Sequence, residues 1–130
     1  FGRGIHAKET ATSLVALRIK HCKLHEGRGD LNRFFRENPE FGDSKELAFL
    51  SGELHRRTKK YAKALKAYTT ALGSRHDEDA LYFRAWCLLA IDKNSLDARS
   101  VLQDYLKKYP HGRHKAEVQR VLQKPLASTK

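Results

Sequence analysis

Apolar residues recur along the chain at intervals of three and four positions, which is the spacing of one face of an α-helix. The first stripe, which begins at Lys8, has these apolar members: Leu14, Val15, Leu17, Ile19, Cys22 and Leu24. Gly27-Arg28-Gly29 is expected to break this helix, and Asp30 would then be the N-cap of a short helix through Phe35. Asn38-Pro39 should end that helix, because the residue before a proline is pushed out of the α region.

Two more apolar stripes follow, separated by a short turn. Ser44 would cap the first helix, and Thr58-Lys59-Lys60 would form the turn after it. Gly73-Ser74 should end the second helix, as a glycine at a helix C-terminus commonly does. The stripes consist of Leu47, Leu50 and Leu54 in the first helix and Tyr61, Ala64, Leu65, Tyr68 and Leu72 in the second.

The same arrangement continues toward the C-terminus. Asp77 or Asp79 would cap a long helix, and a turn at residues 92–95 would separate it from a partner helix. Tyr109-Pro110-His111-Gly112 should end that partner, and a last helix is expected over residues 113–123. Because most of the 3 prolines and 8 glycines fall between the apolar stripes, the pattern predicts an all-α fold.

The sequence of helix, turn, helix and loop repeats with a period of about 34 residues. A shift of that size places Leu47 on Leu81, Phe49 on Phe83, Leu54 on Leu88, Ala64 on Ala98 and Tyr68 on Leu102. The reverse shift places Leu65 on Leu31 and Tyr68 on Phe34. Because turns and helices coincide at the same shift, a chance match of two amphipathic helices is the weaker explanation.

This repeat resembles the tetratricopeptide (TPR) family, whose unit is a helix pair with small residues where the helices touch. Gly52 lies where the family places a glycine in its first helix. Ala64 and Ala71 fall at the two small positions of the second helix, with the aromatic Tyr68 between them. The match is specific only here, since the next unit has Trp86 and Tyr105 at small positions, and the first unit has Asp30.

The resemblance implies a right-handed α–α superhelix of about three TPR-like helix pairs with a C-terminal capping helix. We expect the domain to span residues 8–123, with repeats over about 8–40, 44–75 and 77–110 and the cap over 113–123. Residues 1–7 would be a frayed start and 124–130 a tail. The chain begins with Phe1 and contains no methionine, which indicates an excised domain or a mature product.

The ending of the third unit is similar to a finer pattern within this family. The stretch from Asp104 to Gly112 has the aromatic, Leu and Tyr-Pro ending of bacterial envelope repeat proteins, such as outer-membrane assembly lipoproteins and Tol-Pal accessory proteins. The stretch from Arg33 to Pro39 is a second copy of it. This similarity implies the periplasm or cell envelope as the compartment, with the cytoplasm as the alternative.

By the same resemblance, the first helix of each pair lines a groove that binds a peptide or protein partner. The expected groove residues are Phe49, Glu53, Arg56, Phe83 and Cys87. Phe49 and Phe83, one period apart, would form an aromatic ladder; alternatively, both rings simply pack between helices. Some members clamp a C-terminal carboxylate with Lys and Asn, but Phe49 and Glu53 hold those positions here. Incompletely capped ends would also permit self-association.

The net charge of +11 adds to this prediction the sign of the charge expected on a partner. The densest basic run forms a patch at an expected turn: Arg56, Arg57, Lys59, Lys60 and Lys63. Such a patch favours an acidic partner, and nucleic acid or another anionic surface is the second hypothesis. An ordinary solvated basic face is the plain alternative.

Candidate catalytic and metal-binding residues are sparse. His21 and His25 share a helix face at zinc-ligand spacing, and His111 lies near His114, but no further ligands accompany either pair. Cys22 and Cys87 fall among apolar neighbours and are expected to be buried free thiols. No phosphate-binding glycine motif occurs. The sequence therefore predicts a non-catalytic scaffold without metal or cofactor.

Overall fold

The computed structural model describes residues 5–124, and within them the chain is entirely helical. The elements are α1 (Ile5–Lys20), α2 (Leu24–Glu37), the short 3₁₀ helix η1 (Pro39–Phe41), α3 (Lys45–Arg57), α4 (Tyr61–Ala71), α5 (Asp77–Ile91), α6 (Leu96–Lys108) and α7 (Lys115–Gln123). The prediction of an all-α fold is confirmed. No described helix has both the length and the apolar character needed to cross a bilayer.

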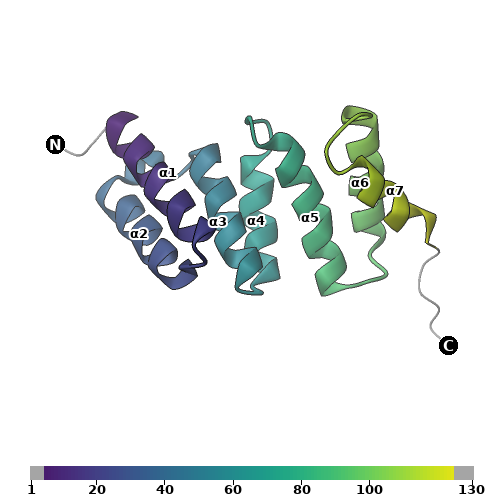
Figure 1. Cartoon of the computed structure of the whole chain (residues 1–130), viewed down its shortest axis with the longest axis horizontal. Coiled ribbons are helices and arrows are strands. Elements are labelled where there is room, and N and C mark those ends of the chain that lie inside the picture. Colours follow the sequence, from purple (N-terminus) through teal and green to yellow (C-terminus); the bar gives the residue numbers. More distant parts are fainter. Residues whose placement is uncertain (1–4, 125–130) are drawn as a thin grey trace.

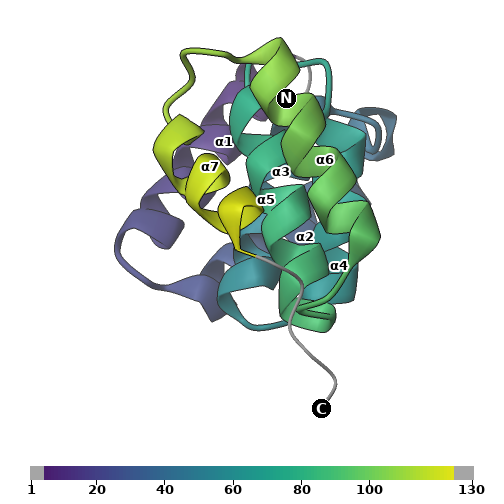
Figure 2. The same ribbon diagram turned by 90° about the vertical axis from the view of Figure 1, so that its right-hand side faces the viewer.

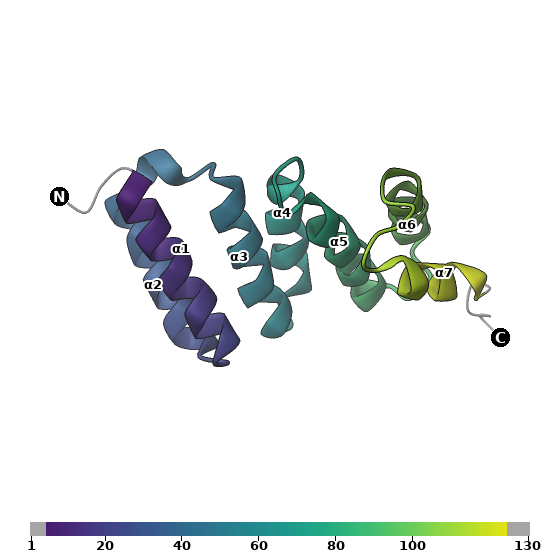
Figure 3. The same ribbon diagram turned by 45° about the horizontal axis from the view of Figure 1, so that its top comes forward.

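The helices follow one another along the long axis of the molecule, with α1 and α7 at opposite ends (Figure 1). Each helix packs against its neighbours in the chain, and α1 also packs against α3. Seen along the row, α1 and α7 lie on one side and α4 and α6 on the other (Figure 2). A third view shows the same extended row (Figure 3). The protein is therefore an open array of antiparallel helices.

Three local cores run through this array, each built by three consecutive helices. The first joins α1, α2 and α3 through Val15, Ile19, Leu31, Phe34, Leu47, Leu50 and Leu54. The second joins α3, α4 and α5 through Ala48, Ala64, Tyr68, Ala71, Ala80 and Cys87. The third joins α5, α6 and α7 through Ala85, Val101, Leu102, Tyr105 and Val118. Since α3 and α5 contribute to two cores each, these two helices connect the array.

The expected start of the chain is corrected by the structure. Helix α1 begins at Ile5, so residues 5–7 are helical, while residues 1–4 lie outside the described part. Gly27-Arg28-Gly29 does not break a helix but lies inside α2. A Cβ on Gly27 would meet Leu54 Cδ2 at 3.1 Å, so the glycine allows α2 to approach α3. Asp30 is not a cap; its carboxylate accepts a hydrogen bond from Arg18 at 2.9 Å.

Both cysteines were expected to be buried, but in the structure only one of them is. Cys22 is exposed in the α1–α2 turn with a φ of 58°, whereas Cys87 is buried in the second core. Helix α1 ends at Lys20, two residues before Cys22, which corrects the longer helix expected there. Both cysteines are free thiols, as expected, but the expected burial is confirmed for Cys87 alone.

At the other helix starts, one expected cap is confirmed, one cap was not expected, and one expected cap is corrected. The Ser44 hydroxyl accepts the Leu47 N–H at 3.3 Å and so caps α3. Ser95 caps α6 in the same way, accepting the Ala98 N–H at 3.0 Å, which the sequence did not reveal. Asp77 begins α5 but does not cap it; its carboxylate accepts the Gly73 N–H at 2.7 Å. Of the expected tail, only Lys124 falls in the described part.

Candidate binding surface

The expected groove residues of α3 and α5 meet around one tyrosine of α4. Tyr68 is fully buried, and its ring centroid lies 5.8 Å from that of Phe49 and 5.7 Å from that of Phe83. Both phenylalanines are half-buried. Tyr68 therefore lies between Phe49 and Phe83 as the middle ring of the expected aromatic ladder. Part of the burial of the two phenylalanine rings comes from this packing between helices.

Polar groups complete this cluster. The Tyr68 hydroxyl donates to Glu53 Oε2 at 2.5 Å and accepts from Arg56 Nε at 2.9 Å. Arg56 also donates to Glu53 Oε1 at 2.9 Å. Burial, together with the charge and hydrogen bond of Glu53, raises the pKa of Tyr68 far above its usual value, so its hydroxyl stays protonated. The three side chains form a closed polar triangle that fixes Arg56 in place.

Two further side chains cover the phenylalanine rings. The His76 imidazole is stacked on Phe49 with centroids 4.4 Å apart. The Arg56 guanidinium carbon lies 4.0 Å from the centre of the Phe83 ring. Burial and the neighbouring Arg75 lower the pKa of His76, which favours the neutral imidazole. A largely buried guanidinium, 16% exposed, and a half-buried imidazole therefore cover the two aromatic rings.

Trp86 was not expected in this cluster, yet it is the most exposed aromatic ring of the group at 39%. It packs on Tyr61 with centroids 5.6 Å apart, and the Arg56 guanidinium carbon lies 5.8 Å from its ring. Its neighbour Cys87 is fully buried, so Cys87 does not line the surface as expected. Burial raises the pKa of the Cys87 thiol to about 11, which keeps it protonated at neutral pH.

A hollow of about 560 Å³ extends this surface toward α1. Its lining residues are Lys8, Glu9, Thr12, Ser13, Phe41, Glu46 and Arg75. Glu46 lies one turn before Phe49 on α3 and pairs with Lys8 at 3.0 Å and Arg75 at 2.9 Å. Charged groups of both signs therefore flank the aromatic cluster on this side.

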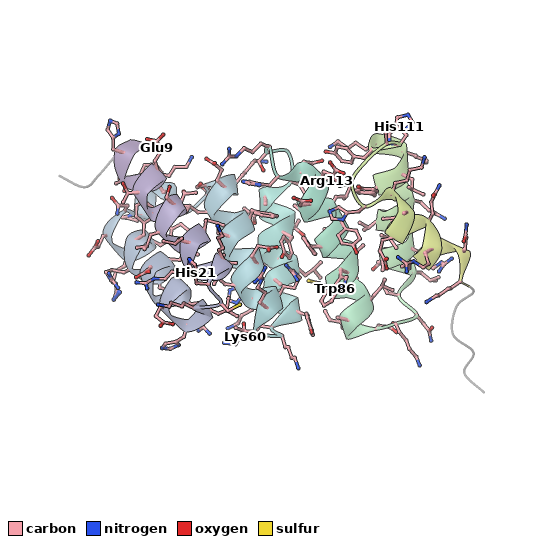
Figure 4. All side chains as sticks on the ribbon, in the orientation of Figure 1. Glu9, His21, Lys60, Trp86, His111 and Arg113 are labelled. Atoms are coloured by element: carbon pink, nitrogen blue, oxygen red, sulfur yellow. The ribbon has the colours of Figure 1, made fainter. Side chains whose placement is uncertain are left out.

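The expected basic patch divides into two parts. Arg56 belongs to the polar triangle, while Arg57, Lys59, Lys60 and Lys63 surround the α3–α4 turn. Arg57 Nη1 donates to the Ile19 carbonyl at 3.4 Å, which holds this turn beside the end of α1. His21 and Lys60 accordingly lie along the same edge of the molecule (Figure 4). Lys20, Lys23 and Arg28 add to the positive charge of this edge, which was not foreseen.

Among residues 5–124, no group of three His, Cys, Asp or Glu side chains comes together around either histidine pair. His114 Nε2 lies 2.8 Å from Asp79 Oδ1, and its ring is stacked on Tyr82 at 3.9 Å. His111, by contrast, is exposed. His114 therefore helps attach the α6–α7 loop to the start of α5.

Low pH is expected to weaken the attachment of the α6–α7 loop to the start of α5. Asp77 accepts from Lys108 at 2.7 Å and from the Tyr109 hydroxyl. Burial alone would raise the pKa of Asp77, but the hydrogen bonds from Lys108, Tyr109 and the Gly73 N–H outweigh it and hold the pKa below its usual value. Because the folded-state pKa is the lower one, this stability is present above the unfolded pKa and is lost as the pH falls through the folded value.

Asp77→Asn should therefore lower the free energy of unfolding at pH 7 by about 1–3 kcal/mol, because it breaks charge-assisted bonds. It should also reduce the loss of stability between neutral pH and pH values below about 4. Urea denaturation followed by far-UV circular dichroism measures both. Asp104→Asn, at an exposed position of α6, is the matched control and should change neither. If the free energy of unfolding depended on pH equally in the two variants, Asp77 would not be the source of the acid-sensitive stability.

The predicted groove residues thus meet with Tyr68, His76 and Trp86, none of which was assigned to the groove from the sequence. The only sequence signal for Trp86 was its position three residues after Phe83 on the same helix. No family model, curated protein or solved structure matches this chain.

Proposed function

We propose that the chain is a non-catalytic scaffold that binds a peptide or protein on its aromatic–arginine surface, which comprises Phe49, Glu53, Arg56, Phe83 and Trp86. The observation that carries this proposal is the pairing of Arg56 with Phe83 and the 39% exposed Trp86. Tryptophan and arginine are the residues most enriched among interface hot spots. Because the polar triangle holds Arg56 in place, little side-chain entropy is lost when a partner binds.

A TPR-like superhelix of three helix pairs and a cap is part of this proposal. Its support is the burial of small residues one period apart, since Ala64 and Ala98 are both fully buried. Gly52 also lies directly against the Tyr68 ring, where an added Cβ would meet ring carbons at 2.8 Å. Stacked helix pairs leave an extended face open to a partner.

The proposal of a non-catalytic role rests on the state of the candidate reactive groups. The Cys87 thiol is buried, with its pKa raised to about 11 by that burial. A nucleophilic cysteine needs the opposite, namely a lowered pKa and access to solvent. Tyr68 and Glu53 are engaged with each other and with Arg56. These groups stabilise the fold and are unsuited to act on a substrate.

The partner's chemistry follows from the charge. With a net charge of +11, the chain attracts acidic partners and repels basic ones. An acidic or aromatic side chain of a partner would approach the part of the Arg56 guanidinium that stays accessible over the Phe83 ring, beside its pair with Glu53. A periplasmic or cell-envelope setting belongs to the proposal only through the Tyr109-Pro110 ending of α6.

Trp86 offers a direct test, because it is the only tryptophan in the chain. Peptides selected from a random display library against the intact chain should shift Trp86 fluorescence to shorter wavelengths as they exclude water from its ring. Trp86→Ala should weaken their binding by at least about tenfold, the effect of losing one hot-spot residue. Isothermal titration calorimetry measures the affinity of the variant, which lacks the fluorophore.

Leu96→Ala is the matched control, because Leu96 is 68% exposed at the start of α6 and takes no part in this surface. It should leave the affinity unchanged. If the selected peptides bound Trp86→Ala as tightly as the parent chain, the partner site would lie outside the aromatic–arginine surface.

A second candidate function is the binding of nucleic acid, which the basic edge at the α1–α2 and α3–α4 turns favours. Phosphate contacts release counterions, so the logarithm of the affinity would fall linearly with the logarithm of the salt concentration. Fluorescence anisotropy with a short labelled oligonucleotide measures that slope. A chain that does not bind at low salt would exclude this function.

A further inference from the structure

A small basic pocket lies on the side of α3 opposite to the aromatic–arginine surface. Its lining residues are Ser51 and His55 of α3 and Lys63, Lys66, Ala67 and Thr70 of α4, and its volume is about 330 Å³. At 3.6 residues per turn, Ser51 and His55 fall on the face of α3 away from Phe49 and Glu53. We call this the His55 pocket. It is separate from the surface assigned to the partner above.

Polar groups in the His55 pocket lack partners within the chain. His55 Nδ1 is buried and has no hydrogen-bond partner in the described structure. Within residues 5–124, no hydrogen bond or ion pair engages the hydroxyl of the half-buried Ser51 or the ammonium groups of Lys63 and Lys66, which are exposed to solvent. A buried polar atom without a partner costs free energy, so such an atom beside a cavity indicates a missing ligand or water.

The charges around His55 are all of one sign. Arg28 of α2, Lys60 of the α3–α4 turn and Lys63 of α4 act on its imidazole. Burial first, and then these three cations, lower the pKa of His55. No acidic side chain lines the pocket. Cations that converge without a counter-charge repel one another, and an anion placed among them would remove that repulsion.

We propose that the His55 pocket binds the phosphate group of a phosphate monoester. Lys63 and Lys66 would supply the charge, while Ser51 would donate a hydrogen bond from its hydroxyl. His55 would donate from Nδ1, which is inaccessible in the free chain and would reach the phosphate after a rotation of the imidazole ring. A water molecule occupies about 30 Å³ in the liquid, so the pocket has room for the phosphate and part of the group that carries it.

Bound phosphate should change the titration of His55. The dianion stabilises the imidazolium, so the pKa of His55, which Arg28, Lys60 and Lys63 lower in the free chain, should rise on binding. By linkage, His55 takes up a proton as the ligand binds near neutral pH. Phosphate that only screens surface lysines would raise the pKa without reaching saturation, whereas a bound phosphate gives a saturable change.

The test is a titration of the intact chain with inorganic phosphate and, separately, with O-phosphoserine, at constant ionic strength. Nuclear magnetic resonance of the His55 imidazole, assigned with a His55→Gln variant, reports the binding. We expect saturable shifts and a raised pKa of His55. Tighter binding of phosphoserine would identify the group as carried on a side chain, and equal binding would identify a free phosphate or small metabolite; either result supports the pocket.

The matched variants separate this site from general basicity. Lys63→Gln with Lys66→Gln should weaken binding by at least about tenfold, because two charge-assisted contacts are lost. Lys93→Gln with Lys107→Gln removes the same charge at exposed positions of the α5–α6 turn and α6, and should leave the affinity unchanged. Trp86→Ala should also leave it unchanged, since the pocket does not depend on the aromatic–arginine surface. Shifts of His55 that never saturate, or equal weakening in both double variants, would overturn the proposal.

Discussion

Tyr68→Ala is expected to remove about 3–5 kcal/mol from the free energy of unfolding, as truncation of a large buried aromatic side chain does. Tyr68 is fully buried in the second core and touches rings from both α3 and α5. Its loss would leave a cavity and would also leave Glu53 and Arg56 without the hydroxyl between them. Urea denaturation followed by far-UV circular dichroism measures the change.

Two tyrosine variants control this prediction. Tyr68→Phe keeps the ring and removes only the hydroxyl, so it should cost about 1–3 kcal/mol. Tyr61→Ala truncates a half-buried tyrosine on the same helix and should cost less than Tyr68→Ala. If Tyr68→Phe destabilised the chain as much as Tyr68→Ala, the packing argument would fail and the polar triangle alone would account for the stability.

Gly112→Ala is expected to cost about 1–3 kcal/mol, the usual range for overpacking. A Cβ at this position would collide with the Tyr105 hydroxyl and with Glu78 Oε2. The Tyr105 hydroxyl donates to Glu78 Oε2 at 2.6 Å and accepts the His114 N–H at 2.9 Å, so the collision would displace the loop that leads into α7. If amide hydrogen exchange in α7 is faster in the variant than in the parent chain while exchange in α3 is unchanged, the loss is local.

Gly29→Ala is the matched control for Gly112→Ala. An added Cβ at Gly29 would meet no atom within 4 Å, and the residue lies within α2. Alanine is favoured over glycine inside a helix by up to about 1 kcal/mol, so this variant should be slightly more stable than the parent. A Gly112→Ala variant as stable as Gly29→Ala would show that the α6–α7 loop adapts without cost.

The helices could be predicted from the sequence because the spacing of apolar residues is a local property. Ends set by a single residue were also predictable, as Ser44 and Pro39 show. Gly27 was not, because a glycine in a turn and a glycine under a neighbouring helix look alike in sequence. Only the position of Leu54, on a different helix, decides between the two.

The candidate surface was predictable in its members but not in its contacts. Phe49 and Phe83 stand one period apart, and the structure places them around the same ring. Arg56 was assigned to both the groove and the basic patch, since its sequence neighbours are basic. Its hydrogen bond to Tyr68 and its position over Phe83 depend on α4 and α5, which the sequence around Arg56 does not specify.

The His55 pocket had no signal in the sequence. His55 and Ser51 are separated from Lys63 and Lys66 by the α3–α4 turn, and only antiparallel packing of the two helices brings them together. The same holds for the basic edge, where the packing of α1 and α2 against α3 places two distant turns side by side and Arg57 donates to the Ile19 carbonyl between them.

A binding face remains available only if the helices form an open row with local cores and do not close into one bundle. Small-angle X-ray scattering over a dilution series, which removes any self-association, tests this directly. A compact domain of 130 residues has a radius of gyration of about 14 Å. We expect a clearly larger value with an asymmetric distribution of interatomic distances. A value near 14 Å with a symmetric distribution would contradict the open array and the surface assigned to it.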